Sequence, residues 1–120
     1  MNLSTPDTDP KCLFCRIVAG DLPADVVRRD ERVVAFRDID PKAPVHVLVV
    51  PVAHYPDVAA LAAADKDLLA DVVRVGAEVA ADECDGQFRL LFITGRAAGQ
   101  SVFHVHGHVL GGRSMQWPPG

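Results

Sequence analysis

Three histidines alternate with other residues near the C-terminal end of the sequence, at positions 104, 106 and 108. Side chains at i, i+2 and i+4 of a β-strand point to one face, about 6.7 Å apart. We therefore expect His104, His106 and His108 to form a row. Imidazole titrates near neutral pH, so such a row can supply a nucleophile, a proton carrier and a hydrogen-bond partner. The spacing alone also fits a transition-metal site or a polar sheet face without chemistry.

A second group, Gly99-Gln100-Ser101, lies immediately before the histidines. Glycine permits a tight backbone turn, and backbone N–H groups together with a hydroxyl are common donors to a bound phosphate. A phosphate-binding turn beside nucleophilic imidazoles predicts phosphoryl or nucleotidyl transfer to a histidine nitrogen.

The pair Cys12 and Cys15 has the spacing of half a tetrahedral zinc site. The alternative is two reduced thiols in a core, because free cysteine is readily buried. A thioredoxin-like redox role is disfavoured because the pair does not follow a strand of a βαβ unit. Cys84 stands apart from the pair, and we interpret it as an isolated thiol.

The composition is that of one globular domain. The 120 residues are 49% hydrophobic and 23% charged, which suits one core but not two independent units. We expect a flexible leader over residues 1–10 and a single domain over 11–120. No stretch reaches the about 20 apolar residues of a membrane span and no secretion signal is present, so the expected location is the cytoplasm, without membrane contact. The net charge of −4 argues against general nucleic-acid binding.

The elements that must position these residues follow from hydrophobic periodicity. An apolar stripe at helical spacing, made of Leu68, Val72, Val75 and Val79, predicts one long helix over 65–82. A short helix is expected over 12–19. Apolar and β-branched runs predict strands over 26–28, 33–36, 45–50, 88–93 and 103–110, with 95–101 as a flexible loop. In the last strand, the residues expected to face the core are Phe103, Val105 and Val109. This order indicates an α+β fold, an antiparallel sheet of about five strands with one long and one short helix.

The segment His104-Val105-His106-Gly107-His108-Val109-Leu110 resembles the signature of the histidine-triad (HIT) family of nucleotide hydrolases and transferases. The resemblance extends over most of the chain. Further matching segments are Cys12-Leu13-Phe14-Cys15-Arg16-Ile17, Phe36-Arg37-Asp38-Ile39, Pro44-Val45-His46, Val50-Pro51-Val52-Ala53-His54, Gly99-Gln100-Ser101-Val102-Phe103 and the C-terminal residues 108–120. The tail resembles that of the Hint branch, whose members are similar to purine nucleoside phosphoramidases. The resemblance implies a homodimer formed through the sheet edge and the long helix, with each tail near the partner's active site.

The resemblance also implies roles for individual residues. His106 would attack the α-phosphate of a purine nucleotide substrate, such as an AMP conjugate or an aminoacyl or amine adenylate, and become transiently nucleotidylated. The implied donors to the phosphate are His108, the Ser101 hydroxyl and the backbone of Gly99 and Gln100, and Ser101 would also protonate the departing amine. Such a hydrolysis requires no organic cofactor.

The same resemblance places the nucleoside. Asp38 would bind the ribose hydroxyls, which suits a carboxylate chemically, although an aspartate before a proline-bearing loop is also common for turn reasons. The residues implied at the base pocket are Phe14, Ile17, Phe36 and Ile39, and apolar residues at such positions are core as often as ligand contacts.

For the metal, the resemblance implies that His54 and His104 complete a structural Zn²⁺ site with Cys12 and Cys15, which leaves His106 free for chemistry. His46 has two interpretations: a residue behind the triad that fixes a tautomer, or a plain buried polar residue.

Two positions depart from the family pattern. Ile93 stands where an asparagine commonly helps to hold phosphate, and Gly107 stands where a larger residue is usual. Both bear on turnover and substrate preference. They keep two other functions open: a nucleotide-binding regulatory protein with little turnover, and a metal carrier that uses the three histidines.

Overall fold

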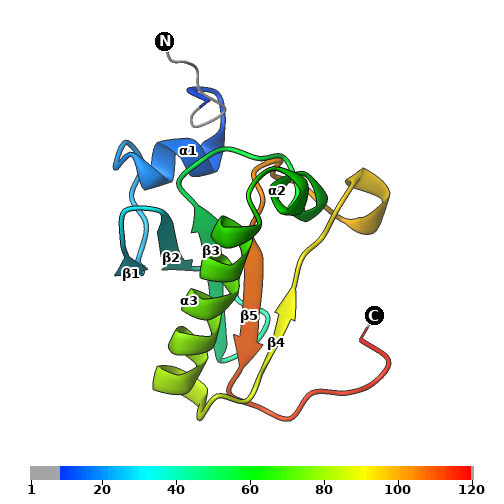
Figure 1. The fold of residues 1–120 in the computed structure, drawn as a ribbon. Coiled ribbons are helices and arrows are strands. Elements are labelled where there is room, and N and C mark those ends of the chain that lie inside the picture. The colour runs from blue at the N-terminus through cyan, green and yellow to red at the C-terminus, as the bar shows by residue number, and fades with distance from the viewer. Residues whose placement is uncertain (1–8, 120) are drawn as a thin grey trace.

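The protein is described by a computed structural model that covers residues 9–119. Its five strands form one sheet in the order β1-β2-β3-β5-β4, and all neighbouring strands are antiparallel (Figure 1). The elements in chain order are α1 Leu13–Val18, β1 Val26–Arg29, β2 Val33–Arg37, β3 Val45–Pro51, α2 Val58–Ala64, α3 Lys66–Cys84, β4 Phe88–Leu91, the 3₁₀ turn η1 Arg96–Ala98 and β5 Gly107–Gly111. The structure confirms the predicted α+β fold with a five-stranded antiparallel sheet.

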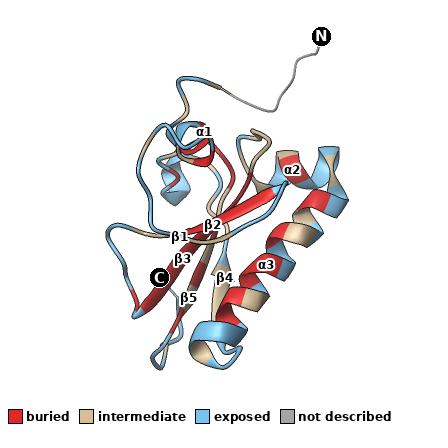
Figure 2. Cartoon of the chain, turned by 90° about the vertical axis from the view of Figure 1, so that its left-hand side faces the viewer, coloured by how far each residue is buried: buried red, intermediate tan, exposed pale blue. Residues whose placement is uncertain are grey.

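Helices cover the sheet on both faces, with α3 on one side and α1 on the other (Figure 2). The central strand β3 is buried along its whole length because both of its faces are covered. Its alternate residues Val45, Val47 and Val49 pack in the core beneath α3, whereas Leu48 and Val50 pack with Phe14 of α1. Side chains of β3 and β5 that point toward the α1 face are therefore placed in a second, smaller core.

The long helix α3 follows from its sequence pattern and its caps. The predicted stripe of Leu68, Val72, Val75 and Val79 is buried against the sheet. The Asp65 side chain accepts a hydrogen bond from the backbone N–H of Leu68 and caps the first turn, and the helix ends at Asp85, whose backbone is left-handed with φ 59°.

Two expectations about secondary structure are wrong. The first is the expectation of one long and one short helix, which misses α2. This Ala-rich helix has no apolar stripe and buries only Leu61. The histidine strand begins at Gly107 rather than Phe103, since its pairing with β3 starts at Val49↔Gly107. The backbone N–H of Val105 donates instead to the carbonyl of Tyr55, outside the sheet. Val105 and Val109 are buried as expected, but the side chain of Phe103 is 42% exposed.

Each end of the described chain makes a hydrogen bond through a backbone carbonyl. Residues 1–8 of the predicted leader lie outside the described residues, but the carbonyl of Asp9 accepts a hydrogen bond from the N–H of Cys12 at 2.9 Å. At the other end, Arg89 on the edge strand β4 donates to the carbonyl of Gln116 at 2.6 Å. The C-terminal tail therefore begins along the β4 side of the sheet.

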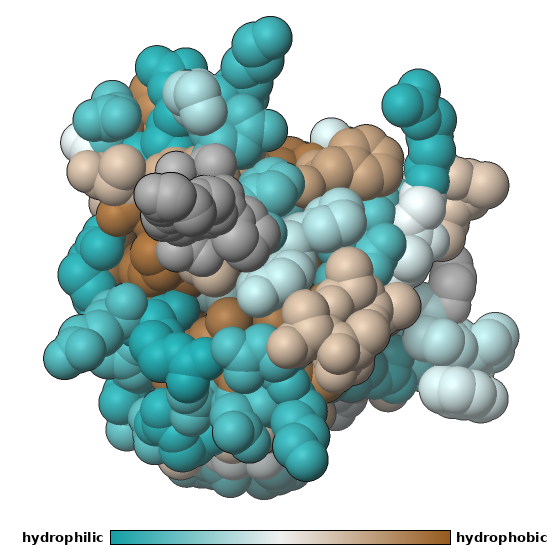
Figure 3. Space-filling model, turned by 45° about the horizontal axis from the view of Figure 1, so that its top comes forward, coloured by the Kyte–Doolittle hydropathy of each residue, from teal (hydrophilic) through white to brown (hydrophobic). Residues whose placement is uncertain are grey.

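The surface mixes polar side chains with small apolar areas, as the view toward the α1 and α2 end shows (Figure 3). The most exposed large apolar side chains are Ile39, Trp117 and Leu13, at 99%, 81% and 47%. Among residues 9–119 no helix is long and apolar enough to span a membrane.

Candidate active site and metal centre

His106 is oriented by a backbone carbonyl. Its Nδ1 lies 2.7 Å from the carbonyl oxygen of His104. A carbonyl can only accept a hydrogen bond, so Nδ1 carries the proton and Nε2 keeps a free lone pair. Burial lowers the pKa of His106 below its ordinary value. The neutral ring, with Nε2 unprotonated, is the form that can act as a nucleophile at neutral pH.

His108, on β5, lies beside His106 on the same side of the sheet. The two ring centroids are 4.9 Å apart. The Nδ1 of His108 lies 2.9 Å from Nε2 of His46, while its own Nε2 is buried and has no hydrogen-bond partner among the described residues. Burial, followed by the charges of His106 and His46, lowers the pKa of His108 to about 4. A neutral imidazole with one unpartnered nitrogen is therefore available next to the nucleophile.

His46 joins Asp38 to His108. Its ring Nε2 lies 3.3 Å from a carboxylate oxygen of Asp38 as well as 2.9 Å from His108. The other Asp38 oxygen accepts a hydrogen bond from the N–H of Asp40 at 2.8 Å, so Asp38 also shapes its own loop. Of the two interpretations of His46, the structure supports contact with the triad.

The Gly99-Gln100-Ser101 segment is closed by its own hydrogen bonds. The N–H of Gly99 donates to the carbonyl of Arg96, and the N–H of Gln100 donates to the carbonyl of Gly95, each at 3.0 Å. The Gln100 side chain is buried and bonds to the N–H of Gly95 and the carbonyl of Pro56. A phosphate that accepted from these amides would first have to displace the turn. Ser101 is exposed and shares a surface hollow with His54 and Phe103.

The residues expected at a base pocket separate into two groups. Phe14 and Phe36 are buried with ring centroids 5.4 Å apart, and Ile17 packs against the same cluster. Phe14 also packs edge-to-face against His106, with the two ring centroids 4.9 Å apart. Ile39 is 99% exposed and outside this cluster. Phe14 therefore touches the nucleophile directly, whereas Ile39 stands apart at the surface.

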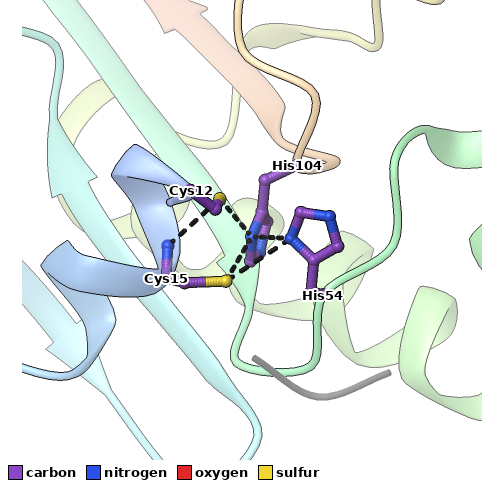
Figure 4. A group of neighbouring side chains, drawn as sticks. All are labelled: Cys12, Cys15, His54 and His104. Atoms are coloured by element: carbon purple, nitrogen blue, oxygen red, sulfur yellow. Dashed lines mark hydrogen bonds between the residues drawn. The ribbon is translucent and has the colours of Figure 1, made fainter. Parts of the chain in front are cut away.

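The predicted metal ligands come together at the N-terminal end of α1 (Figure 4). One ligand atom from each of Cys12, Cys15, His54 and His104 lies within 4.8 Å of the others. The two histidine Nδ1 atoms are 3.2 Å apart. Cys12 Sγ and Cys15 Sγ lie 3.4 and 3.5 Å from Nδ1 of His104, and Cys15 Sγ lies 3.4 Å from Nδ1 of His54.

These spacings fit a tetrahedral ion. With metal–nitrogen lengths of about 2.0 Å and metal–sulfur lengths of about 2.3 Å, two nitrogens would be about 3.3 Å apart and a nitrogen and a sulfur about 3.5 Å apart. The Nε2–H of His104 donates to the carbonyl of Pro51 at 2.8 Å, which leaves Nδ1 as the ligand atom. The cluster could therefore hold a metal ion.

Two of the four side chains, Cys15 and His104, are buried and favour their neutral forms. Burial raises the pKa of the Cys15 thiol to about 11 and lowers the pKa of His104 to about 4. Both sulfurs also accept backbone N–H groups, Cys12 from Cys15 at 3.4 Å and Cys15 from Asp9 at 3.3 Å. These donors would stabilise thiolates once a metal displaced the protons.

The three histidines of the motif do not form one metal site. Among the described residues, the candidate ligand groups are the Cys/His cluster and the trio Asp38, His46 and His108. His104 belongs to the first group, His108 to the second, and His106 to neither. The metal-carrier interpretation that uses all three histidines is therefore not supported.

The structure explains one of the two departures from the family pattern, Gly107, and places the other, Ile93. A Cβ at Gly107 would lie 3.0 Å from Cδ1 of Leu90 and 3.1 Å from Cζ of Phe92, so neighbouring side chains occupy the space of a larger residue. The Cγ2 of Ile93 would be 3.9 Å from a Cβ at Gly99, so this apolar side chain lies beside the predicted phosphate turn. An isoleucine there supplies no hydrogen bond to a phosphate.

The sheet topology and the histidine cluster define a HIT fold, and comparison with known proteins agrees. The HIT domain family matches residues 19–115. An uncharacterised HIT-like protein of Synechocystis sp. is 44% identical over 109 residues, covering 90% of this chain and 96% of that protein. Purine nucleoside phosphoramidase of Escherichia coli K12 is 38% identical over 105 residues, covering 86% of this chain and 88% of that enzyme.

A solved structure gives the same result. A HIT family hydrolase from Legionella pneumophila has a TM-score of 0.88 at 42% identity, covering 92% of this chain and 100% of that one. The chain belongs to the HIT domain family. One of these relatives is named as a phosphoramidase and another as a hydrolase, and both names support the interpretation of this chain as a hydrolase.

Proposed function

We propose that the protein hydrolyses purine nucleoside phosphoramidates, or related nucleotide conjugates, through a covalent nucleotidyl intermediate on His106. The observation that carries this proposal is the 2.7 Å contact between Nδ1 of His106 and the carbonyl of His104. This contact keeps the proton on Nδ1 and leaves Nε2 unprotonated, with its lone pair free. The similarity to a purine nucleoside phosphoramidase supports the choice of substrate.

The reaction has two displacements at phosphorus. In the first, the Nε2 lone pair of His106 attacks the α-phosphorus, the P–N bond to the amine breaks, and the amine leaves with a proton supplied by Ser101. In the second, water attacks the phosphorus and the bond to Nε2 breaks. Nucleoside monophosphate leaves and neutral His106 is regenerated, while the proton lost by water restores Ser101. Hydrogen-bond donors aimed at the phosphate, such as His108, would stabilise the charge that develops in both steps.

The nucleoside would be bound beside this centre. Asp38 is the proposed partner of the ribose hydroxyls. Phe14 and Ile39 remain proposed base contacts, and because Ile39 lies at the surface outside the Phe14 cluster, joint contact requires the loop that carries Ile39 to move toward the base. Gly99, Gln100 and Ser101 remain proposed phosphate contacts. For the two backbone amides this requires that the closed turn described above opens when the nucleotide binds.

The direct test is hydrolysis of an adenosine phosphoramidate by the wild type and by His106→Asn, which keeps a polar side chain at the Nδ1 position but has no Nε2. We expect turnover to be lost in the variant. Mass spectrometry of acid-quenched wild-type reactions should show an added nucleotidyl group on His106. Tight nucleotide binding with neither turnover nor adduct would instead support a nucleotide-binding regulatory protein, a role that Ile93 favours.

We also propose that Cys12, Cys15, His54 and His104 hold a structural Zn²⁺ ion. Support comes from the donor spacing and from the carbonyl of Pro51 that fixes the His104 ring. Four protein ligands would close the coordination shell, so the ion would tie α1 to the segment before β5 and take no part in chemistry. Two thiolate ligands suit a reducing compartment, in keeping with a cytoplasmic protein.

Metal content tests the zinc proposal without an activity assay. Purified wild type should contain about one zinc per chain by elemental analysis, and Cys15→Ser should contain much less. Cys84→Ser is the matched control, since Cys84 lies outside the cluster. A chelator should lower the unfolding temperature of the wild type but not of Cys15→Ser. Equal zinc content in all three proteins would refute the assignment.

We propose that the chain forms a homodimer through the β4 edge and α3. β4 is an outer strand of the sheet, and Leu91 on it and Val73 on α3 are 45% and 40% exposed. An exposed apolar edge strand readily pairs with another chain. Sedimentation should report a dimer for the wild type and a monomer for Leu91→Asp. Leu13→Asp, at a site that is 47% exposed on α1, should remain dimeric.

A further inference from the structure

The C-terminal end of α3 carries a charge that the helix itself does not favour. Glu83 lies in the last turn of α3, where the free carbonyl groups of a helix disfavour a negative side chain. The same turn contains no basic residue. Both carboxylate oxygens of Glu83 instead accept hydrogen bonds from Arg37, the last residue of β2, at 2.9 Å each. The partner that compensates the charge of Glu83 therefore comes from the sheet and not from the helix.

The contact between Arg37 and Glu83 is bidentate. Nη1 of Arg37 donates to Oε1 of Glu83 and Nη2 donates to Oε2, an arrangement that fixes the orientation of the guanidinium as well as its distance. The hydrogen bond to Glu83 raises the pKa of Arg37, and the hydrogen bond from Arg37 lowers the pKa of Glu83, so both groups are charged at neutral pH. Nε of Arg37 also lies 3.6 Å from a carboxylate oxygen of Asp25.

Arg37 directly precedes the proposed ribose ligand. It pairs with Val47 of β3, and its N–H donates to the carbonyl of Asp25 at 3.0 Å. The N–H of the next residue, Asp38, donates to the carbonyl of His46 at 3.0 Å, and the chain then leaves the sheet. Successive side chains of a strand point to opposite faces, so Arg37 faces α3 and Asp38 faces the candidate active site.

We propose that Arg37 and Glu83 are positioning residues that fix the end of β2 and thereby hold the carboxylate of Asp38 where it can bind the ribose hydroxyls. The proposal rests on the proposed function, which gives Asp38 its ribose contact. Neither side chain would touch the nucleotide, because the ion pair lies on the α3 side of the sheet. An exposed ion pair contributes little to global stability. A carboxylate that must meet two hydroxyls is nevertheless sensitive to a small displacement of its backbone.

The sign of the effect of Glu83→Gln separates positioning from simple electrostatics. A nucleotide is an anion, so removal of a negative charge would by itself strengthen its binding or leave it unchanged. Loss of the contact with Arg37 would instead weaken the ribose contact. Glu78→Gln is the matched control, since Glu78 lies on the same helix and accepts a hydrogen bond from Arg28 of β1 at 3.1 Å, away from Asp38.

The quantity to measure is the Kd of 2′,3′-dideoxyadenosine monophosphate divided by the Kd of AMP, by titration calorimetry at neutral pH. Both ligands carry the same phosphate, so this Kd ratio isolates the ribose hydroxyls. We expect a ratio of about 10 in the wild type, as for one charged hydrogen bond. Glu83→Gln and Arg37→Gln should each lower it about two- to fivefold, the equivalent of one exposed ion pair.

Two combinations test whether the residues act as a unit and through Asp38. The double variant of Arg37→Gln and Glu83→Gln should have the same Kd ratio as either single variant, because each substitution alone already breaks the contact. In an Asp38→Asn background, where the ribose contact is already weakened, Glu83→Gln should leave the ratio unchanged. Glu78→Gln should keep the wild-type ratio. Thermal unfolding compares the folding of all variants.

A wild-type Kd ratio in Glu83→Gln would overturn the proposal, as would an equal loss in Glu78→Gln. A lower ratio in the double variant than in either single variant would show that the two residues do not act together. A wild-type ratio near one would contradict the ribose contact of Asp38, and the role of Arg37 with it. A wild type that prefers AMP but hydrolyses no phosphoramidate contradicts the proposed hydrolysis alone. If Arg37→Gln does not fold, Glu83→Gln, at an exposed position, still decides the question.

Discussion

The half-buried His108 should make the stability of the fold depend on pH in a predictable way. Its pKa is lowered to about 4 in the folded protein by burial and by His106 and His46, with Asp38 opposing. In the unfolded chain the ordinary value of about 6.5 applies. Between these two values the unfolded chain binds more protons, so stability is complete above pH 6.5 and is lost as the pH falls toward 4. The full shift corresponds to about 2 kcal/mol lost at pH 5 relative to pH 7.5, and solvent screening at this half-buried side chain makes this an upper limit.

The measurement is urea unfolding of the wild type and of His108→Gln at pH 7.5 and pH 5. Glutamine does not titrate, so the variant should lose less stability than the wild type between the two pH values, by up to about 2 kcal/mol. Distant titrating groups are common to both proteins and cancel in this difference, whereas His46 and His106 are coupled to His108 and their pKa values change with it. Equal pH dependence of the free energy of unfolding in the two proteins would refute the assignment of a strongly lowered pKa to His108.

Three further predictions concern packing and substrate contacts. Gly107→Leu should lower the free energy of unfolding by about 1–3 kcal/mol in urea, because a Cβ would lie 3.0 Å from Leu90 and 3.1 Å from Phe92; an unchanged midpoint would show that the space is free. Asp38→Asn should raise KM for a ribonucleotide substrate about tenfold, as loss of a charged hydrogen bond would, and an equal rise for a 2′,3′-dideoxy analogue would exclude ribose binding. Phe14→Leu should lower kcat about 2- to 10-fold because the edge-to-face contact with His106, whose ring centroids are 4.9 Å apart, is lost; Phe36→Leu is the matched control, and an equal loss there would point to general core damage.

Much of the fold could be predicted because its elements have simple periods. The stripe of α3 and the alternating or continuous apolar runs of the strands identify their elements directly. α2 lacks such a pattern, since Val58–Ala64 is mostly alanine and only Leu61 is buried. The alternation of residues 103–108 suggests a strand, but a strand also needs a partner, and β3 pairs with this segment only up to Gly107. Pairing depends on tertiary structure that local periodicity does not contain.

The site could be predicted only in part for the same reason. The spacing of the histidines and of Cys12 and Cys15 is local and visible, whereas His54 and His104 lie 50 positions apart and were connected to the cysteines through family resemblance alone. The contact between His46 and His108 depends on the register of β3 against β5. The closed turn at Gly99 and Gln100 depends on hydrogen bonds whose alternatives a sequence does not distinguish.

His104 serves two neighbours with two different parts of itself. Its side chain faces the cysteines, while its backbone carbonyl accepts a hydrogen bond from Nδ1–H of His106. Every amino acid keeps that carbonyl, so substitution at position 104 removes the ligand but not the acceptor. The two roles can therefore evolve independently. A variant in which packed apolar side chains replaced Cys12, Cys15 and the imidazole of His104 would still have the carbonyl that orients His106. Of the three histidines of the motif, His104 is thus the one whose side chain matters least for the chemistry at His106.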